Sequence, residues 1–229
     1  TSPATPLPFV SLVMPIRNEG AFIAQALGAA LAQDYPQERL EIIVADGMST
    51  DDTRRIVEEF QAQHAGLRLI DNHGKFVATG LNAALREARG DIIIRADGHC
   101  VIAKDYVRQC VQRLQEDKVD GVGGPIETIG ETYIAETIAL AMSSGFGVGG
   151  SAFRTVKDRR MFVESVAFPA YTRRAVEMAG FFDEELIRNQ DDEYNYRLGA
   201  RGARILLGPF AHEVVRRTAE QVFIPLTVG

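Results

Sequence analysis

The chain has no tryptophan and only two cysteines, Cys100 and Cys110, among its 229 residues. Two cysteines cannot build a disulfide framework, and they are too few for a structural zinc site unless His99 contributes. A reduced, intracellular chain is therefore the simpler interpretation. The sequence also lacks any run of the roughly 18–20 apolar residues that a membrane helix requires.

Basic residues are in the minority, with 25 Lys and Arg against 31 Asp and Glu, for a net charge of −6. A nucleic-acid binder usually carries a basic excess, so we expect no nucleic-acid partner. Hydrophobic residues make up 46% and charged residues 24%, an ordinary globular composition that excludes disorder. A chain of this length buries about 70–75% of its unfolded surface, and so needs no disulfide or metal to fold.

Strand-like and helix-like patterns alternate over about the first 120 residues. Apolar runs predict strands at 9–14, 40–45, 67–70, 92–94 and 119–122. Helical spacing predicts helices at 21–33, from 51 onward, at 77–88 and at 106–114. We expect Ser49 or Thr50 to cap the second helix and Gly90 to end the third. The alternation is typical of an α/β fold, a mostly parallel sheet with helices on both faces.

Polar residues follow three of the predicted strands, in the segments 15–19, 46–49 and 97–99. One such strand end is ordinary loop chemistry. In open parallel sheets, however, ligands bind beyond the carboxyl ends of the strands. Three polar ends on one edge therefore favour a binding site.

The alternation fades after residue 125, where the patterns predict helices at 131–144, 173–179 and 191–201 and strands at 163–168 and 204–207. We therefore expect a single compact domain with two lobes, residues 9–124 and residues 125–229.

Five segments in a fixed order resemble glycosyltransferase family 2, the nucleotide-sugar-dependent enzymes of the GT-A fold. They are Val10-Ser-Leu-Val-Met-Pro-Ile-Arg-Asn-Glu19, Ile42-Ile-Val-Ala-Asp-Gly-Met-Ser-Thr-Asp51, Gly74-Lys75 with Gly80-Leu-Asn82, Gly90-Asp-Ile-Ile-Ile-Arg-Ala-Asp-Gly-His99 and Gln190-Asp-Asp-Glu-Tyr-Asn-Tyr-Arg197. Within the family the chain is most similar to bacterial exopolysaccharide glucosyltransferases of the succinoglycan type. The resemblance implies a nucleotide-sugar-binding lobe at 9–124 and an acceptor-binding, catalytic lobe at 125–229.

The chain departs from the family pattern at several positions. Ala45 stands before Asp46 where two aspartates are usual, and Gln190 stands before Asp191 where the family has Glu-Asp. The Asp-x-Asp metal motif is replaced by Asp97-Gly-His99. The Gln-x-x-Arg-Trp motif of processive synthases is absent, so we do not expect long-chain processive synthesis.

A divalent cation is the natural counter-charge for a departing diphosphate. Asp97 and His99 are two residues apart at a strand end, so both can face the same side. With diphosphate oxygens and water they could complete an octahedral Mn²⁺ or Mg²⁺ site, and the imidazole favours Mn²⁺. The resemblance adds His212 as a third ligand. Alternatively, Asp97 is a turn former before Gly98, and the two histidines have only loop or packing roles.

The resemblance implies that Asp46 contacts the uracil or ribose, and that Pro15, Arg17 and Glu19 frame the same nucleotide. A carboxylate suits this role because it accepts from a base N–H or from ribose hydroxyls. Lys75 is a candidate phosphate contact. The alternatives are that Glu19 is a first-turn helix acid and that Lys75 is a solvated loop lysine.

A sugar hydroxyl that attacks the donor must lose its proton, which requires a base. The resemblance assigns this role to Asp191, at the start of the predicted helix. Asp192 and Glu193 diverge from it by about 100° per residue and suit the positive end of the helix instead. Arg197 could pair with Glu193 at the i,i+4 spacing.

Together with these features, the resemblance implies an inverting, metal-dependent transfer of a hexose, with glucose expected, from a UDP-sugar to a hydroxyl of a glycan or lipid-linked glycan. We expect a role in exopolysaccharide or cell-surface glycan synthesis, in the cytoplasm at the inner face of the membrane, with association with the membrane surface. A retaining transferase and a non-catalytic nucleotide-sugar-binding protein are the alternatives. The acceptor, the linkage and the oligomeric state are left open.

Overall fold

The computed structural model describes residues 6–124, 126–130, 160–166, 169–209 and 213–217. The helix predicted at 131–144 and the candidate metal ligand His212 lie outside the described residues. The strands are β1 (Val10–Ile16), β2 (Leu40–Asp46), β3 (Leu67–Asp71), β4 (Ile92–Arg95), β5 (Cys100–Ile102), β6 (Gly121–Gly123), β7 (Ile126–Gly130), β8 (Met161–Phe162), β9 (Ala170–Thr172), β10 (Ile205–Leu207) and β11 (Glu213–Arg217). The helices are α1 (Ile23–Leu31), the short 3-10 helix η1 (Gln37–Arg39), α2 (Thr53–Gln61), α3 (Val77–Glu87), α4 (Tyr106–Glu116), α7 (Arg173–Ala179) and α8 (Gln190–Ala200).

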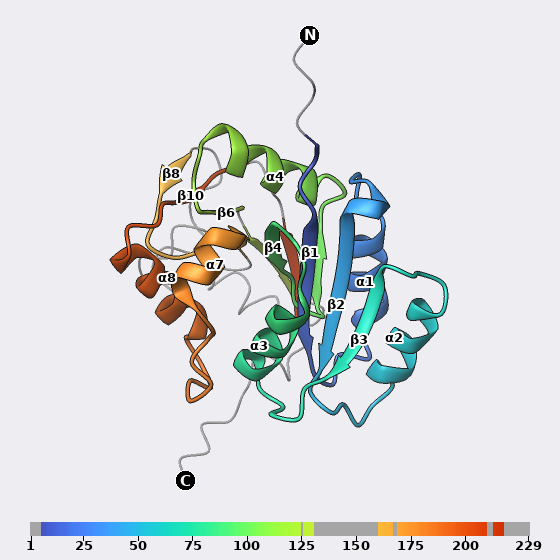
Figure 1. Cartoon of the computed structure of the whole chain (residues 1–229). Coiled ribbons are helices and arrows are strands. Elements are labelled where there is room, and N and C mark those ends of the chain that lie inside the picture. The colour runs from blue at the N-terminus through green and yellow to red at the C-terminus, as the bar shows by residue number, and fades with distance from the viewer. Residues whose placement is uncertain (1–5, 125, 131–159, 167–168, 210–212, 218–229) are drawn as a thin grey trace.

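Eight strands form one sheet in the order β3-β2-β1-β4-β9-β6-β10-β8 (Figure 1). The first four strands are parallel, as the sequence predicts. β9 runs antiparallel between β4 and β6, which joins strands from both predicted lobes in one sheet. β5, β11 and β7 form a second, three-stranded sheet.

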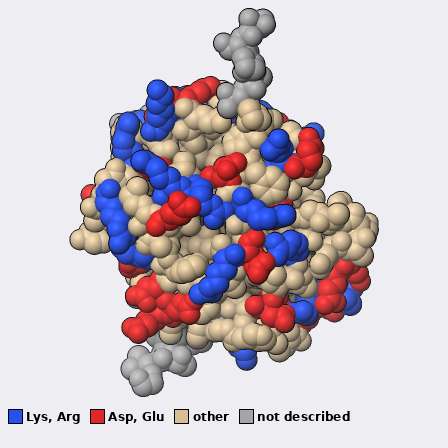
Figure 2. Space-filling model, viewed as in Figure 1, with Lys and Arg blue, Asp and Glu red and all other residues tan. Residues whose placement is uncertain are grey.

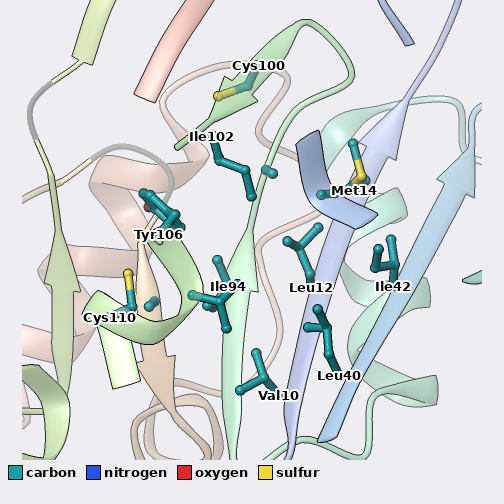
Figure 3. Close-up of a cluster of buried hydrophobic side chains, with 14 of the residues drawn as sticks. Val10, Leu12, Met14, Leu40, Ile42, Ile94, Cys100, Ile102, Tyr106 and Cys110 are labelled. Atoms are coloured by element: carbon teal, nitrogen blue, oxygen red, sulfur yellow. The ribbon is translucent and has the colours of Figure 1, made fainter. Parts of the chain in front are cut away.

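The central strands are buried on both faces, which explains their continuous apolar runs. Along β1, the side chains of Val10, Leu12 and Met14 pack with α1 and α4 on one face, as Figure 3 shows for part of this core. Val13 points to the other face, into a second core with α3, α7 and α8. The helices therefore cover the sheet on both sides.

Cys100 and Cys110 are both buried in the first core (Figure 3). Within the described ranges, no helix combines the length and the apolarity needed to cross a bilayer.

Two expectations about helix ends are wrong. The hydroxyl of Ser49 donates to Asp46 (2.5 Å), and it is Asp51 that accepts from the backbone N–H of Thr53 (3.0 Å) at the start of α2. α3 ends at Glu87 rather than at Gly90. The glycine is instead needed for close packing, because a Cβ at position 90 would lie 2.5 Å from the backbone nitrogen of Ser11.

Candidate active site

The carboxyl ends of β1, β3 and β4 meet at one edge of the sheet and enclose a cleft of about 130 Å³. Its lining residues are Pro15, Ile16, Arg17, Glu19, Asn72, Lys75, Phe76, Val77, Asp97 and His99. Six of the residues predicted from the sequence are among them, from segments up to 84 positions apart in the chain. Of the three predicted polar strand ends, 15–19 and 97–99 line this cleft, whereas 46–49 does not.

One wall of the cleft is the turn from β3 into α3. The side-chain amide of Asn72 donates to the carbonyl of Phe76 (2.9 Å), and Lys75 adopts a left-handed backbone with φ of 65°. α3 can approach because of Gly80, where a Cβ would lie 2.9 Å from Asn72 Nδ2 and 3.1 Å from Pro15 Cβ. Asn72 was missed in the sequence, although its place directly after a strand was a usable signal.

Glu19 and His99 form a contact across the cleft, with Glu19 Oε1 2.8 Å from His99 Nδ1. Both side chains are largely buried, at 11% and 17% exposed. A carboxylate that accepts from Nδ1–H fixes the ring in the tautomer with its lone pair on Nε2. Gly98 allows the backbone between Asp97 and His99 to lie close to Glu19, since a Cβ at position 98 would lie 2.9 Å from Glu19 Cγ. Glu19 thus orients the predicted metal ligand as well as lining the cleft.

Arg95, the last residue of β4, lies between Asp97, the predicted metal ligand, and Asp191, the predicted base. Its Nε is 3.0 Å from Asp97 Oδ1 and its Nη2 is 3.3 Å from Asp97 Oδ2, so the pair is a bidentate fork. Its Nη1 donates to Asp191 Oδ1 at the start of α8. Sequence reasoning assigned Arg95 no role, because nothing in the sequence places α8 beside the end of β4.

Asp191 is 27% exposed and lies among charged groups. Burial raises the pKa of its carboxyl above the ordinary value, the Arg95 guanidinium opposes this shift, and the Asp97 carboxylate adds to it. Burial acts to lower the pKa of Arg95, but the carboxylates of Asp191 and Asp97 raise it by more than burial lowers it. The guanidinium therefore remains charged. The base candidate therefore has a raised proton affinity and a permanent cationic neighbour.

The segment that leads into α8 is tied to α3 by Asn82. Its side chain accepts from the backbone N–H of Phe182 (2.8 Å) and donates to the carbonyl of the same residue (2.9 Å). Asn189 then takes a left-handed conformation, with φ of 58°, immediately before the helix. These two asparagines fix where α8 begins, and so where Asp191 lies.

The two acidic neighbours of Asp191 in the first turn of α8 contact other protein groups. Asp192 is exposed and accepts a hydrogen bond from the hydroxyl of Ser165 (2.7 Å). Glu193 pairs with Arg197 at the i,i+4 spacing, with 2.7 Å between Arg197 Nη2 and Glu193 Oε2. The expected pairing of Arg197 is confirmed.

Asp46, like Asp191, is not among the residues that line the cleft, and its surroundings differ from those of the other predicted residues. It is fully buried, accepts from Ser49, and lies 3.3 Å from Arg54 Nη1, which also contacts Asp71 at 2.7 Å. Its side chain is not among those that line the cleft. In this conformation it holds together the ends of β2 and β3 and the start of α2.

The residues at the cleft fit a divalent cation with an open coordination sphere. Across the described part of the chain, no group of three or more His, Cys, Asp or Glu side chains is arranged to hold a metal ion. Asp97 and the oriented imidazole of His99 offer one oxygen and one nitrogen donor, which suit Mn²⁺ when the remaining positions are filled by phosphate oxygens and water. A metal-ligating His whose other nitrogen contacts a carboxylate is the usual arrangement in proteins.

Comparison with curated proteins finds relatives at about 30% identity. A dolichyl N-acetyl-alpha-D-glucosaminyl phosphate 3-beta-D-2,3-diacetamido-2,3-dideoxy-beta-D-glucuronosyltransferase of Methanococcus voltae is 30% identical over 230 residues, which cover 96% of this chain and 71% of the relative. The succinoglycan biosynthesis protein ExoA of Rhizobium meliloti is 30% identical over 196 residues, 85% of this chain and 59% of ExoA.

Solved structures show the same fold at lower identity. Residues 1–349 of S. aureus TarS in complex with UDP superimpose with a TM-score of 0.70 and 19% identity, over 93% of this chain and 62% of that one. The mannosyltransferase PcManGT of Pyrobaculum calidifontis, in complex with GDP-Man and Mn²⁺, superimposes with a TM-score of 0.69 and 23% identity. This match covers 92% of this chain and 57% of that one. The fold is therefore the GT-A fold, as the sequence predicted.

A family model described as glycosyl transferase family 2 matches residues 11–177, which include all but the first residue of β1, the strands β2 to β4, the cleft residues and Arg95. With this match and the two relatives, the chain belongs to glycosyl transferase family 2.

Proposed function

We propose that this chain catalyses the metal-dependent, inverting transfer of a hexose, with glucose expected, from a UDP-sugar to a hydroxyl of a glycan or lipid-linked glycan. The observation that carries the proposal is the placement of Asp97, His99 and Asp191 around one sheet edge, with Arg95 between the carboxylates. This arrangement would place a cation site near the diphosphate and a candidate base near the acceptor hydroxyl. Ion pairs through Arg95 connect the two.

The nucleotide diphosphate would lie in the cleft between β1, β4 and the turn before α3. Pro15 and Arg17 line one side and Lys75 the other, so two cationic side chains face the position of the phosphates. To contact the uracil or ribose, the Asp46 carboxylate would need to break its hydrogen bond with the Ser49 hydroxyl, or keep it and accept a further hydrogen bond from the nucleotide.

Asp97 and His99 would hold a Mn²⁺ or Mg²⁺ ion, with His212 as a further ligand. When bound, the ion supplies positive charge to the departing diphosphate. Glu19 keeps the His99 ring oriented through the contact at 2.8 Å, and Asp97 lies at the strand end, where the phosphates can be reached.

Asp191 would accept the proton of the acceptor hydroxyl at its carboxylate oxygen as the new glycosidic bond forms. Its raised pKa increases its proton affinity, and Arg95 stabilises the ionised state that is needed before the transfer. Attack from the side opposite the leaving diphosphate inverts the anomeric centre in one step.

The acceptor would be held by the lobe at 125–229, which contributes α8 to the site. The Methanococcus voltae relative is named for a dolichyl-phosphate-linked sugar, and ExoA for succinoglycan synthesis. The first name supports a lipid-linked glycan as the acceptor, and the proposal includes a place of action at the cytoplasmic face of a membrane.

The experiment is a comparison of the wild type with Asp191→Asn. We expect the variant to bind UDP with Mn²⁺ like the wild type, as measured by calorimetry, and to lose about 10²- to 10⁴-fold in transfer rate, the usual contribution of a general base. Turnover within threefold of the wild type would contradict the assignment of the base. The matched control is Asp192→Asn, one residue along the same helix, which should transfer normally.

NMR of the product should show the anomeric configuration opposite to that of the donor, and retention would contradict the inverting mechanism.

A further inference from the structure

Arg95 is a buried cation at the junction of the two halves of the site. Its side chain is 8% exposed, and its three guanidinium nitrogens contact Asp97 through Nε and Nη2 and Asp191 through Nη1. One planar group therefore contacts a carboxylate at the end of β4 and another at the start of α8, 94 positions apart in the sequence.

We propose that Arg95 is a positioning residue that couples the two sides of the reaction: it fixes Asp191 where the acceptor proton is removed, and it moderates the affinity of Asp97 for the cation. This inference rests on the proposed function. It adds a residue to which the sequence motifs assign no task.

The positioning part follows from how α8 is held. Asp191 is in the first turn of α8, after a segment that α3 holds through Asn82, and Arg95 supplies the ion pair from β4 to its carboxylate. A guanidinium that grips Asp97 with two nitrogens has a fixed orientation, so it presents Nη1 to Asp191 in one geometry. Lysine carries the same charge but cannot make this fork.

The moderating part follows from charge. The fork occupies both oxygens of Asp97, at 3.0 and 3.3 Å, and places a positive charge beside a carboxylate that would have to bind a second cation. Removing that charge strengthens the attraction between Asp97 and a divalent ion. The positioning role and the moderating role therefore predict opposite changes when Arg95 is replaced, in transfer rate and in metal affinity.

The experiment compares the wild type with Arg95→Met, Arg95→Lys and a matched control, Arg89→Met. Arg89 also forks onto a buried carboxylate, with its Nη2 2.8 Å and its Nε 3.1 Å from Glu41 Oε2, but at the opposite edge of the sheet. Each variant is measured for Mn²⁺ affinity in the presence of UDP by calorimetry, for kcat and KM of transfer, and for Tm.

We expect Arg95→Met to bind Mn²⁺ about three- to tenfold more tightly, through the lost repulsion. We expect its kcat to fall about 10- to 100-fold, because Asp191 would no longer be held in place and a small misplacement of a catalytic group lowers the rate by such a factor. Arg95→Lys should keep a Mn²⁺ affinity near that of the wild type and still lose kcat, because it has the charge without the fork. Arg89→Met should lower Tm while leaving metal affinity and kcat unchanged.

A merely structural role would weaken Mn²⁺ binding and transfer together, in proportion to the loss of Tm, and that result would overturn the inference. Wild-type behaviour of both Arg95 variants would overturn it as well, while the proposed function would stand if the wild type shows Mn²⁺-dependent UDP binding. Absence of such binding in the wild type would contradict the proposed function itself, and the inference with it.

Discussion

Glu19 shows how a single side chain gains a role from its contacts. From the sequence alone it was either a nucleotide contact or a first-turn acid of the following helix. In the structure its carboxylate contacts the imidazole of His99 at 2.8 Å, while its backbone carbonyl accepts from the N–H groups of Phe22 and Ile23. The residue therefore supports the start of α1 with its backbone and the candidate metal ligand with its side chain.

The contact predicts the effect of Glu19→Ala. Loss of a carboxylate that orients a metal-ligating His typically costs 10–100-fold in metal affinity. We expect Mn²⁺-dependent UDP binding to weaken by about that factor, whereas UDP binding without metal stays the same. Calorimetric titration of UDP with and without Mn²⁺ measures both. Glu116→Ala, on the exposed side of α4, is the control, and equal effects of the two substitutions would remove Glu19 from this role.

At the scale of elements, the strand ends were predictable and the connections between them were not. The apolar runs of β1 and β4 mark their own ends, and polar residues follow at once, so these two walls of the cleft could be placed from the sequence. The end of β2 looked the same in the sequence but does not line the cleft. β9 has only three residues, too few to show periodicity, and its antiparallel position between β4 and β6 depends on long-range pairing. The same holds for Arg95 and Asn82, whose partners are about 100 residues away.

The start of β2 carries a buried ion pair that contributes to stability rather than to the site. Glu41 is 2% exposed and accepts from the hydroxyl of Ser11 (2.6 Å), the backbone N–H of Arg89 (2.8 Å) and the Arg89 guanidinium (2.8 Å). Burial acts to raise the pKa of Glu41, but these hydrogen bonds and the charge of Arg89 outweigh it, and the net pKa lies below the ordinary value of 4.5.

A pKa that is lower in the folded state than in the unfolded chain stabilises the fold above the unfolded value, and this contribution is lost as the pH falls through the folded value. We expect the free energy of unfolding, measured by urea titration, to fall as the pH drops below about 4.5. Glu41→Gln should cost about 1–3 kcal/mol at neutral pH, because buried donors lose their ionised partner. The same variant should show a smaller loss of stability on acidification, and an unchanged pH dependence would contradict the role of Glu41.

At the scale of the whole molecule, the two edges of the sheet carry different chemistry. The amino edge of β1 and β2 has Ser11 and Glu41 in a closed network with Arg89, which ties the sheet to the end of α3. The carboxyl edge has Glu19 and Asp97 at the cleft and Asp191 linked to Asp97 through Arg95, with charges that a ligand can still reach. Figure 2 shows acidic side chains interspersed among the basic ones on the face that carries α3, α7 and α8.

The central claim is that a cation bound by Asp97 and His99 carries the charge of the nucleotide diphosphate in this cleft. The most direct test is a crystal structure of the protein with UDP and Mn²⁺, with data collected at the manganese absorption edge. The account predicts an anomalous peak within bonding distance of Asp97 and His99 and of the UDP phosphates, with the nucleotide between Arg17 and Lys75. A peak elsewhere, or UDP bound away from this sheet edge, would contradict it.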